Sequence, residues 1–256
     1  MNPEFRIRWK NAGYSAKCGS AAVVPPPPRK WRRVYYITTL EHGINDIALG
    51  RIKLARFSDL NDPFELLAVS FRERPIRKAV RDFKATYDSH TGLLCFSTDW
   101  TNPVLWSHYG QKHRGMCLGF KIPRSRLERV KYKDKRLLAR LDEETRPAEI
   151  SNELQKQLLC TKYRHWRYEA EWRIFVPLKD TIPEGRLHFY PFQDDLQLAE
   201  VILGPQCDLS LREIRRLTKL RYPDAVTYRA RLALKFFSVV PKESTVLQHG
   251  SSASLN

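Results

Sequence analysis

The chain has little of what would tie it to a membrane or to an oxidising compartment. It contains no run of about 18 apolar residues, so the sequence predicts no spanning helix and no membrane partner. Arg6, Arg8 and Lys10 interrupt the N-terminal stretch, which therefore has no apolar signal core. The five cysteines are odd in number and form no C-x-x-C pair, which argues against a disulfide framework and a cysteine-based zinc site. We therefore expect a cytoplasmic protein.

Acidic residues are also scarce, with 28 Asp and Glu against 45 Lys and Arg, for a net charge of +17. Residues 1–36 hold eight Lys and Arg against Glu4, and residues 121–140 hold nine against two carboxylates. Clustered positive charge favours a polyanion, with nucleic acid first and an acidic protein or membrane surface second. A merely solvated surface fits the composition equally well. We predict nucleic-acid contact through 1–36 and 121–140, and no pattern indicates an oligomeric state.

The chain divides into three parts by composition. Residues 1–30 are basic and end in the proline run 25–28, which favours an extended, disordered arm. Residues 31–241 carry the apolar patterning of one domain, and residues 242–256 are rich in small polar residues, which predicts a disordered tail.

The domain contains about eight strand-like runs and interspersed helices without a regular βαβ rhythm. This pattern predicts an α+β fold, a single domain with a mixed, largely antiparallel sheet and flanking helices. A capping box at Thr38-x-x-Glu41 and a left-handed Gly50 are expected to bound the first helix. Residues 123–162 are charged and are predicted to be mostly helical.

One carboxylate is placed where a strand should be buried. In 198–203, Leu198-Ala199-Glu200-Val201-Ile202-Leu203, both faces are apolar apart from Glu200. A buried, unpaired carboxylate is costly, so Glu200 should be paired, open to a cleft or functional. A structural ion pair with an arginine is an equally good interpretation.

A second polar stretch is Trp166-Arg167-Tyr168-Glu169-Ala170-Glu171-Trp172-Arg173-Ile174-Phe175. If it is extended, Glu169, Glu171 and Arg173 share one face. Carboxylates beside an arginine can position a sugar or an amide. The alternative is an ordinary half-exposed strand with cross-strand ion pairs.

Two further motifs carry polar side chains, and His108 in the first of them is expected to form hydrogen bonds within the core or a cleft wall. The run Trp106-Ser107-His108-Tyr109 is expected on a short helix, where Ser107 and His108 point about 100° apart and form no local dyad. In 61–65, Asn61-Asp62-Pro63-Phe64-Glu65, Asp62 is expected to hold the loop through an Asx-type bond. The sequence has no P-loop, no G-x-G-x-x-G, no H-E-x-x-H and no G-x-S-x-G motif.

In this order, the landmarks resemble a bacterial family known as domain of unknown function 2971. The residues that carry the resemblance are Tyr35-Tyr36 with Thr38-Thr39, the run 60–65, Leu105–Tyr109 with His113-Arg114-Gly115, Trp166–Arg173, and Glu200–Gly204. The similarity extends over about residues 33–235. It implies no activity by itself.

The two ends of this region more distantly resemble DNA-targeting ADP-ribosyltransferase toxins. That resemblance implies NAD as the substrate, Glu200 as the catalytic glutamate, and Tyr36 in place of a histidine that helps to hold NAD. With it, we assign Tyr36 or Tyr109 to stacking on the nicotinamide and Arg51 or Arg56 to the pyrophosphate. Glu171 is assigned as a further catalytic residue. The remaining residues assigned to NAD binding are Thr38, Asn61, Asp62, Trp106 and His108, and none is assigned to a metal.

The leading hypothesis is therefore an ADP-ribosyltransferase-like effector or defence toxin that acts on nucleic acid or protein. A non-enzymatic nucleic-acid-binding module is the first alternative. A nuclease that binds a metal through Asp62, Glu169 and Glu171 is the second. Whether Tyr36 and Glu200, or Asp62 and Glu171, face one pocket should separate the first hypothesis from the nuclease.

Overall fold

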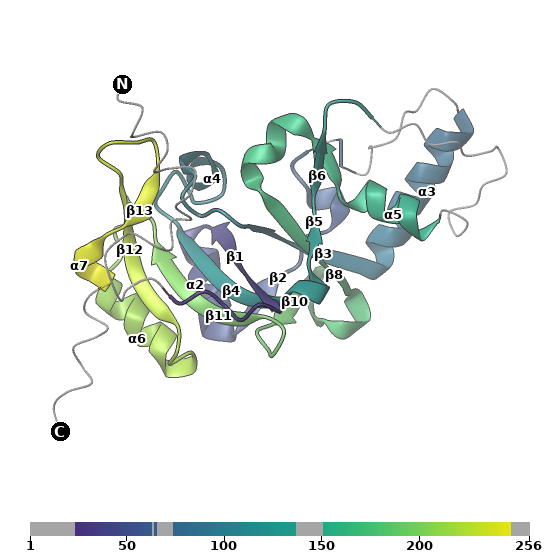
Figure 1. The fold of residues 1–256 in the computed structure, drawn as a ribbon. Helices are drawn as coiled ribbons and strands as arrows, with labels where there is room; N and C mark the ends of the chain where they lie inside the picture. The colour runs from purple at the N-terminus through teal and green to yellow at the C-terminus, as the bar shows by residue number, and fades with distance from the viewer. Residues whose placement is uncertain (1–23, 63, 66–73, 137–150, 247–256) are drawn as a thin grey trace.

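The computed structural model describes residues 24–62, 64–65, 74–136 and 151–246. These residues form an α+β fold with one large, curled, mixed sheet and helices at both of its ends (Figure 1). The expected fold class is thereby confirmed. The basic segments are described only at 24–36 and 121–136, so the rest of each lies outside the described residues. No helix in the described part is long and apolar enough to cross a membrane.

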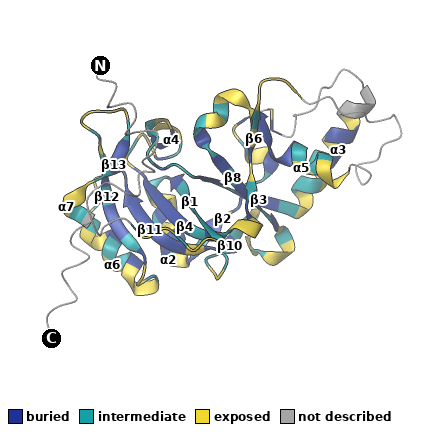
Figure 2. Cartoon of the chain, in the orientation of Figure 1, coloured by how far each residue is buried: buried dark blue, intermediate teal, exposed yellow. Residues whose placement is uncertain are grey.

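The large sheet has eight strands in the order β13-β12-β11-β4-β1-β3-β8-β5. Only the β11–β12 pair is parallel within this sheet. The neighbouring strands β4 and β11 are almost wholly buried (Figure 2), as their apolar runs predict. The strands are β1 (Trp31–Thr38), β3 (Thr91–Ser97), β4 (Met116–Pro123), β5 (Glu128–Arg129), β8 (Glu171–Pro177), β11 (Gln197–Leu203), β12 (Val226–Leu232) and β13 (Val239–Pro241).

Two smaller sheets flank the large one. The first has the order β2-β10-β9, and the second pairs β6 with β7 in parallel. Their strands are β2 (Arg51–Lys53), β9 (Ile182–Glu184), β10 (Leu187–Pro191), β6 (Lys131–Lys133) and β7 (Thr161–Tyr163).

Helices lie toward both ends of the curled sheet (Figure 1). Near β12, α6 packs against that strand and against α2. Near β3 and β8, α3 and α5 bury apolar residues in a separate cluster. The helices are α2 (Leu40–Leu49), α3 (Arg74–His90), α4 (Pro103–His108), α5 (Asn152–Leu159), α6 (Leu211–Arg221) and α7 (Glu243–Val246), with 3₁₀ turns at 57–59, 124–126, 164–169 and 178–180.

The sheet opens at its middle. Along its whole length β1 pairs with β4, but it pairs with β3 at one described position only, Tyr35 with Ser97. Beyond that position the edges of β1 and β3 diverge, so their backbone amides and carbonyls lack each other as partners there. Backbone polar groups need partners, and such a seam is a natural place for a ligand.

Local signals were correct in part. Gly50 ends α2 in the left-handed conformation at φ 68°, as expected, but the cap is Thr39, which accepts from the His42 amide, and not Thr38. The prediction of mostly helix over 123–162 was wrong for 128–133, which forms β5 and β6. Those strands form because their partners are β8 and β7, distant in sequence, and pairing overrides local propensity. The tail is described to Val246, within α7.

Candidate functional site

A pocket of about 290 Å³ lies at the open seam between β1 and β3. Its walls include residues 35–39 of the first strand and its end, and residues 93–97 of the second. Consecutive residues from both strands line it, as expected where two strand edges part. The wall is mainly apolar, with aromatic surface from Tyr36, whose ring contacts that of Phe96 edge-on. Such a concave, mostly apolar site with few polar groups is typical of small-molecule pockets.

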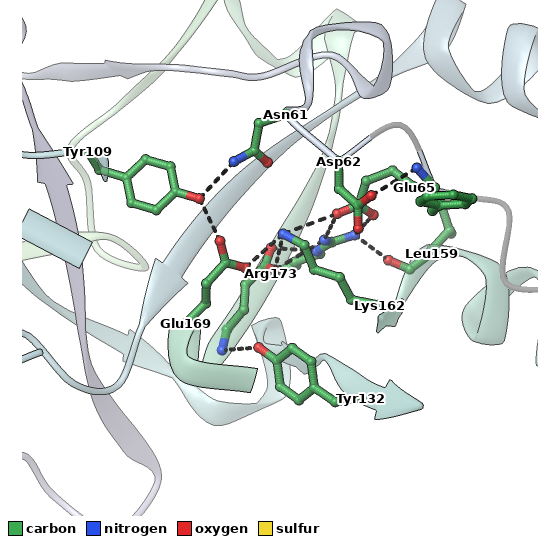
Figure 3. A network of polar contacts seen from close by, with 11 residues as sticks. Asn61, Asp62, Glu65, Tyr109, Tyr132, Leu159, Lys162, Glu169 and Arg173 are labelled. Carbon is green, nitrogen blue, oxygen red and sulfur yellow. Dashed lines mark hydrogen bonds and ion pairs between the residues drawn. The ribbon is translucent and has the colours of Figure 1, made fainter. Parts of the chain in front are cut away.

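Glu169 is the carboxylate most clearly held at this pocket (Figure 3). One of its oxygens accepts a hydrogen bond of 2.5 Å from the Tyr109 hydroxyl, and the other lies 2.7 Å from the Lys162 amine. The Tyr109 hydroxyl in turn accepts from the Asn61 side-chain amide at 2.9 Å. Glu169 is 6% exposed, so its orientation is fixed by these partners and not by water.

The backbone at Glu169 explains how two glutamates reach the same site. The stretch is not extended throughout. Residues 164–169 form a 3₁₀ helix, Ala170 takes a left-handed conformation at φ 45°, and β8 begins at Glu171. The 3₁₀ turn therefore delivers Glu169 to the pocket, while the strand delivers Glu171 and Arg173 on one face. The expected shared face holds for Glu171 and Arg173 only.

Behind Glu169 lies a fully buried ionic cluster (Figure 3). Arg173 is 0% exposed and binds Glu65 through two nitrogens at 2.7 and 3.1 Å. Its Nε donates to Glu171 at 2.7 Å, and it also donates to the Leu159 carbonyl at 2.7 Å. Such two-pronged arginine–carboxylate contacts fix geometry as well as charge. The cluster therefore anchors the loop that carries Glu65 to β8.

Lys162 joins this cluster to the pocket. Its amine lies 2.7 Å from Glu169 and 3.4 Å from both Glu65 and Glu171. Burial alone would lower the pKa of Lys162, but the three carboxylates outweigh it and raise that pKa. Lys162 is therefore a permanent cation, with Trp166 packed 4.7 Å from it at the ring centroid.

The two neighbouring glutamates have pKa values pushed in opposite directions. Burial raises the pKa of Glu169 above its ordinary value, against the effect of Lys162. Burial also acts on Glu171, but Arg173 and Lys162 outweigh it and lower its pKa to about 2. Such a divergence is typical of sites where one carboxyl exchanges protons and the other stays ionised. Of these two glutamates, Glu169 is thus the candidate for proton exchange at the pocket.

Several residues assigned from sequence do meet at this pocket. Its lining includes Tyr36, Thr38, Asn61, Tyr109 and Glu171. The pairs that were expected to separate the two enzyme hypotheses are both divided. Tyr36 lines the pocket without Glu200, and Glu171 lines it without Asp62.

Asp62 holds the loop beside the pocket. Its carboxylate accepts from the Phe64 amide at 2.9 Å, which is the expected Asx-type bond. Its second oxygen is buried without a hydrogen-bond partner among the described residues. Its role in the structure is to shape the turn that presents Asn61 and Glu65.

Glu200 lies elsewhere, buried but outside the pocket lining. It forms an ion pair with Arg33 and accepts a hydrogen bond of 2.8 Å from the Tyr228 hydroxyl. Burial first, then Glu200, raise the pKa of Tyr228, so this tyrosine stays protonated and donates. The arrangement matches the structural ion pair that the sequence left open.

Four other assigned residues also lie away from the pocket lining. Arg51 pairs with Glu184 and stacks over Phe189, and Arg56 lies 3.6 Å from Asp88. The Trp106 side chain is fully buried and donates a hydrogen bond to the Trp100 carbonyl. The His108 side chain is exposed and stacks on the Tyr168 ring. The cation that does line the pocket from β2 is Lys53.

The carboxylate set expected of a nuclease is not assembled as a metal site. Glu169 and Glu171 both contact Lys162, while Asp62 binds its own loop. Among the described residues, no group of three or more His, Cys, Asp or Glu side chains is arranged to hold a metal ion.

The central part of this region also carries the family signal. Residues 105–174 match the family model described as "Protein of unknown function (DUF2971)". The matched segment contains Tyr109, Lys162, Glu169, Glu171 and Arg173. It thus contains the members of the ionic cluster other than Glu65, and it supports the resemblance drawn from the motifs within it. No curated protein and no solved structure matches the chain.

The sequence did not reveal Lys53 and Lys162. Neither belongs to a motif, and a lysine is seldom buried unless it is paired. The signal for Lys162 was indirect. Glu65, Glu169 and Glu171 require compensating positive charge if they are buried together, and Arg173 alone leaves a net negative charge.

Proposed function

We propose that the chain is an enzyme that breaks the bond between nicotinamide and ribose in NAD and transfers the ADP-ribosyl group to an acceptor. The observation that carries the proposal is Glu169, a buried carboxylate with a raised pKa held at the pocket by Tyr109 and Lys162. The assignment of the catalytic carboxylate therefore moves from Glu200 to Glu169.

The chemistry fits the geometry. When the C1′–N bond breaks, its electron pair passes to the ring nitrogen, and neutral nicotinamide leaves. Positive charge then builds on the ribose, as in glycoside cleavage. A preorganised carboxylate in a water-poor site stabilises that charge. The acceptor oxygen or nitrogen adds to C1′, and its proton passes to Glu169.

The other pocket features suit the substrate. Tyr36 and Tyr109 offer aromatic surface for the nicotinamide ring. The diverging edges of β1 and β3 offer backbone donors and acceptors to a carboxamide group.

The basic segments give evidence for the acceptor. They are far apart in sequence, but β1 and β4 bring Arg32 opposite Ile122 and Arg33 opposite Lys121. Arg32 stacks over Trp172, and its pKa is lowered by burial and then by Arg124 and Arg129, so several arginines crowd together. Crowded cations beside an aromatic ring favour a nucleic-acid acceptor over a protein one.

The test is release of labelled nicotinamide from NAD by wild type, Glu169→Gln and Glu200→Gln, with oligonucleotide or lysate protein as the acceptor. We expect Glu169→Gln to reduce release by about 10²-fold or more, and Glu200→Gln to retain most of it if it folds. Far-UV circular dichroism checks that each variant is folded. Equal loss in both variants, or no release by folded wild type with any acceptor, would refute the proposal.

A further inference from the structure

A second cavity of about 230 Å³ lies beside the first, and Lys162 lines both. The adjacent residues Phe64 and Glu65 are divided between them, with Phe64 in the second and Glu65 in the first. Parallel pairing of β6 with β7 places Lys133 opposite Tyr163 on the wall of the second cavity. The two cavities therefore share a wall built from the same short segments.

The second cavity differs from the first in charge. Lys133, Lys135 and Arg136 line it, and its single carboxylate, Asp134, is paired with Arg164 at 2.8 Å. Among the described residues, neither Lys133 nor Lys135 has a carboxylate partner. Lys133 and Lys135 therefore leave positive charge on this cavity that attracts an anion, and phosphate oxygens suit both lysine and arginine.

Two half-exposed rings complete the cavity. Phe64 is 52% exposed and Tyr163 is 47% exposed. Each ring is supported by a neighbour: Arg136 lies 5.3 Å from the centroid of Phe64, and His165 stacks on Tyr163 at 4.9 Å. Supported, exposed aromatic faces beside cations are what a nucleobase and its phosphates require.

From these features we infer that the second cavity binds the adenosine diphosphate part of a dinucleotide, with the base against Phe64 or Tyr163 and the phosphates on Lys133, Lys135 and Arg136. The inference rests on the proposed function only in naming NAD as the whole ligand. It also supplies the cations for the pyrophosphate, since Arg51 and Arg56 lie away from the first pocket.

The test measures ADP binding to the full chain by isothermal titration calorimetry, which needs no turnover. The variant is Lys133→Ala with Lys135→Ala, and the matched control is Lys179→Ala with Lys219→Ala, two exposed lysines elsewhere with the same loss of charge. We expect ADP to bind wild type and the control equally, and to bind the first variant at least about tenfold more weakly. No binding by wild type, or equal weakening in both double variants, would overturn the inference.

Two further arms separate this inference from the proposed function. Nicotinamide riboside lacks the phosphates and adenine, so its cleavage should be unchanged in Lys133→Ala/Lys135→Ala while KM for NAD rises about tenfold. Cleavage of NAD without ADP binding would leave the function standing and remove the second site. A single-stranded oligonucleotide that displaces ADP and binds about tenfold more tightly would instead assign the cavity to nucleic acid, against the inference.

Discussion

Two of the buried carboxylates in the described part of the chain, Glu200 and Glu169, differ in a way that burial alone does not explain. Glu200 is closed in by Arg33 and Tyr228 and does not line the pocket. Glu169 has a similar set of partners, a cation and a tyrosine, but it lines a pocket at an open seam of the sheet. A cation and a tyrosine thus compensate the buried charge in both places, and only the cavity beside Glu169 sets the two apart. Access to a cavity, and not burial, distinguishes the candidate catalytic residue.

The largest effect should come from removing the arginine at or behind each site, which is Arg33 at Glu200 and Arg173 in the ionic cluster behind Glu169. Replacing Arg173 with Leu leaves Glu65 and Glu171 buried without their main partner. Removing one member of a buried pair costs about 3–5 kcal/mol, so we expect a loss of that size in the free energy of unfolding, measured by chemical denaturation. Arg33→Leu should cost less, because Glu200 keeps the bond from Tyr228. An equal or greater loss for Arg33→Leu would contradict this view of the two sites.

The comparison also shows how far the sequence reaches. The pattern of Leu198–Leu203 was sufficient to predict a buried strand and to leave a structural ion pair open for Glu200. It was not sufficient to show that Arg33 is the partner, because Arg33 lies far away in the chain and the contact depends on β1, β4 and β11 lying side by side. Local patterns report periodicity and turns, but they do not report strand order.

The same reason explains the mixed result at the pocket. Tyr36, Asn61, Tyr109 and Glu171 were chosen from motifs, and the fold gathers them. The cations assigned to the pyrophosphate, Arg51 and Arg56, instead pair with Glu184 and Asp88. Lys162 lies on a three-residue strand with no motif, and its importance follows only from the three carboxylates that the fold brings around it.

A matched pair of tyrosines sharpens the contrast. Tyr228 donates to Glu200 at 2.8 Å, and Tyr109 donates to Glu169 at 2.5 Å. Tyr228→Phe should cost about 1.5–3 kcal/mol of stability, because it removes a buried hydrogen bond to a charge, and it should leave nicotinamide release nearly unchanged. Tyr109→Phe should lower release by about tenfold with a smaller loss of stability, since Tyr109 is only partly buried. Chemical denaturation and nicotinamide-release assays on both variants check this prediction. Loss of release in Tyr228→Phe, with release retained in Tyr109→Phe, would contradict a catalytic role for Glu169.

The smallest effect is a shift in pH dependence. Because burial raises the pKa of Glu169 above the ordinary 4.5, a reaction that needs the ionised form should lose rate as pH falls through that raised value, already above pH 4.5. The bond from Tyr109 lowers this pKa, so Tyr109→Phe should move the acid limb of kcat/KM to still higher pH.

The free energy of unfolding depends on pH with the opposite sign. A raised pKa in the folded state means that folding favours the protonated carboxyl of Glu169. The stability that this protonated carboxyl contributes is present below its pKa in the unfolded chain, and it is lost as pH rises through its pKa in the folded protein. Substitution of Glu169 by Gln should therefore remove this dependence of stability on pH. Arg33→Lys, a change at the closed site, should leave the acid limb in place, and a limb that moved with Arg33 would show that the two carboxylates act together.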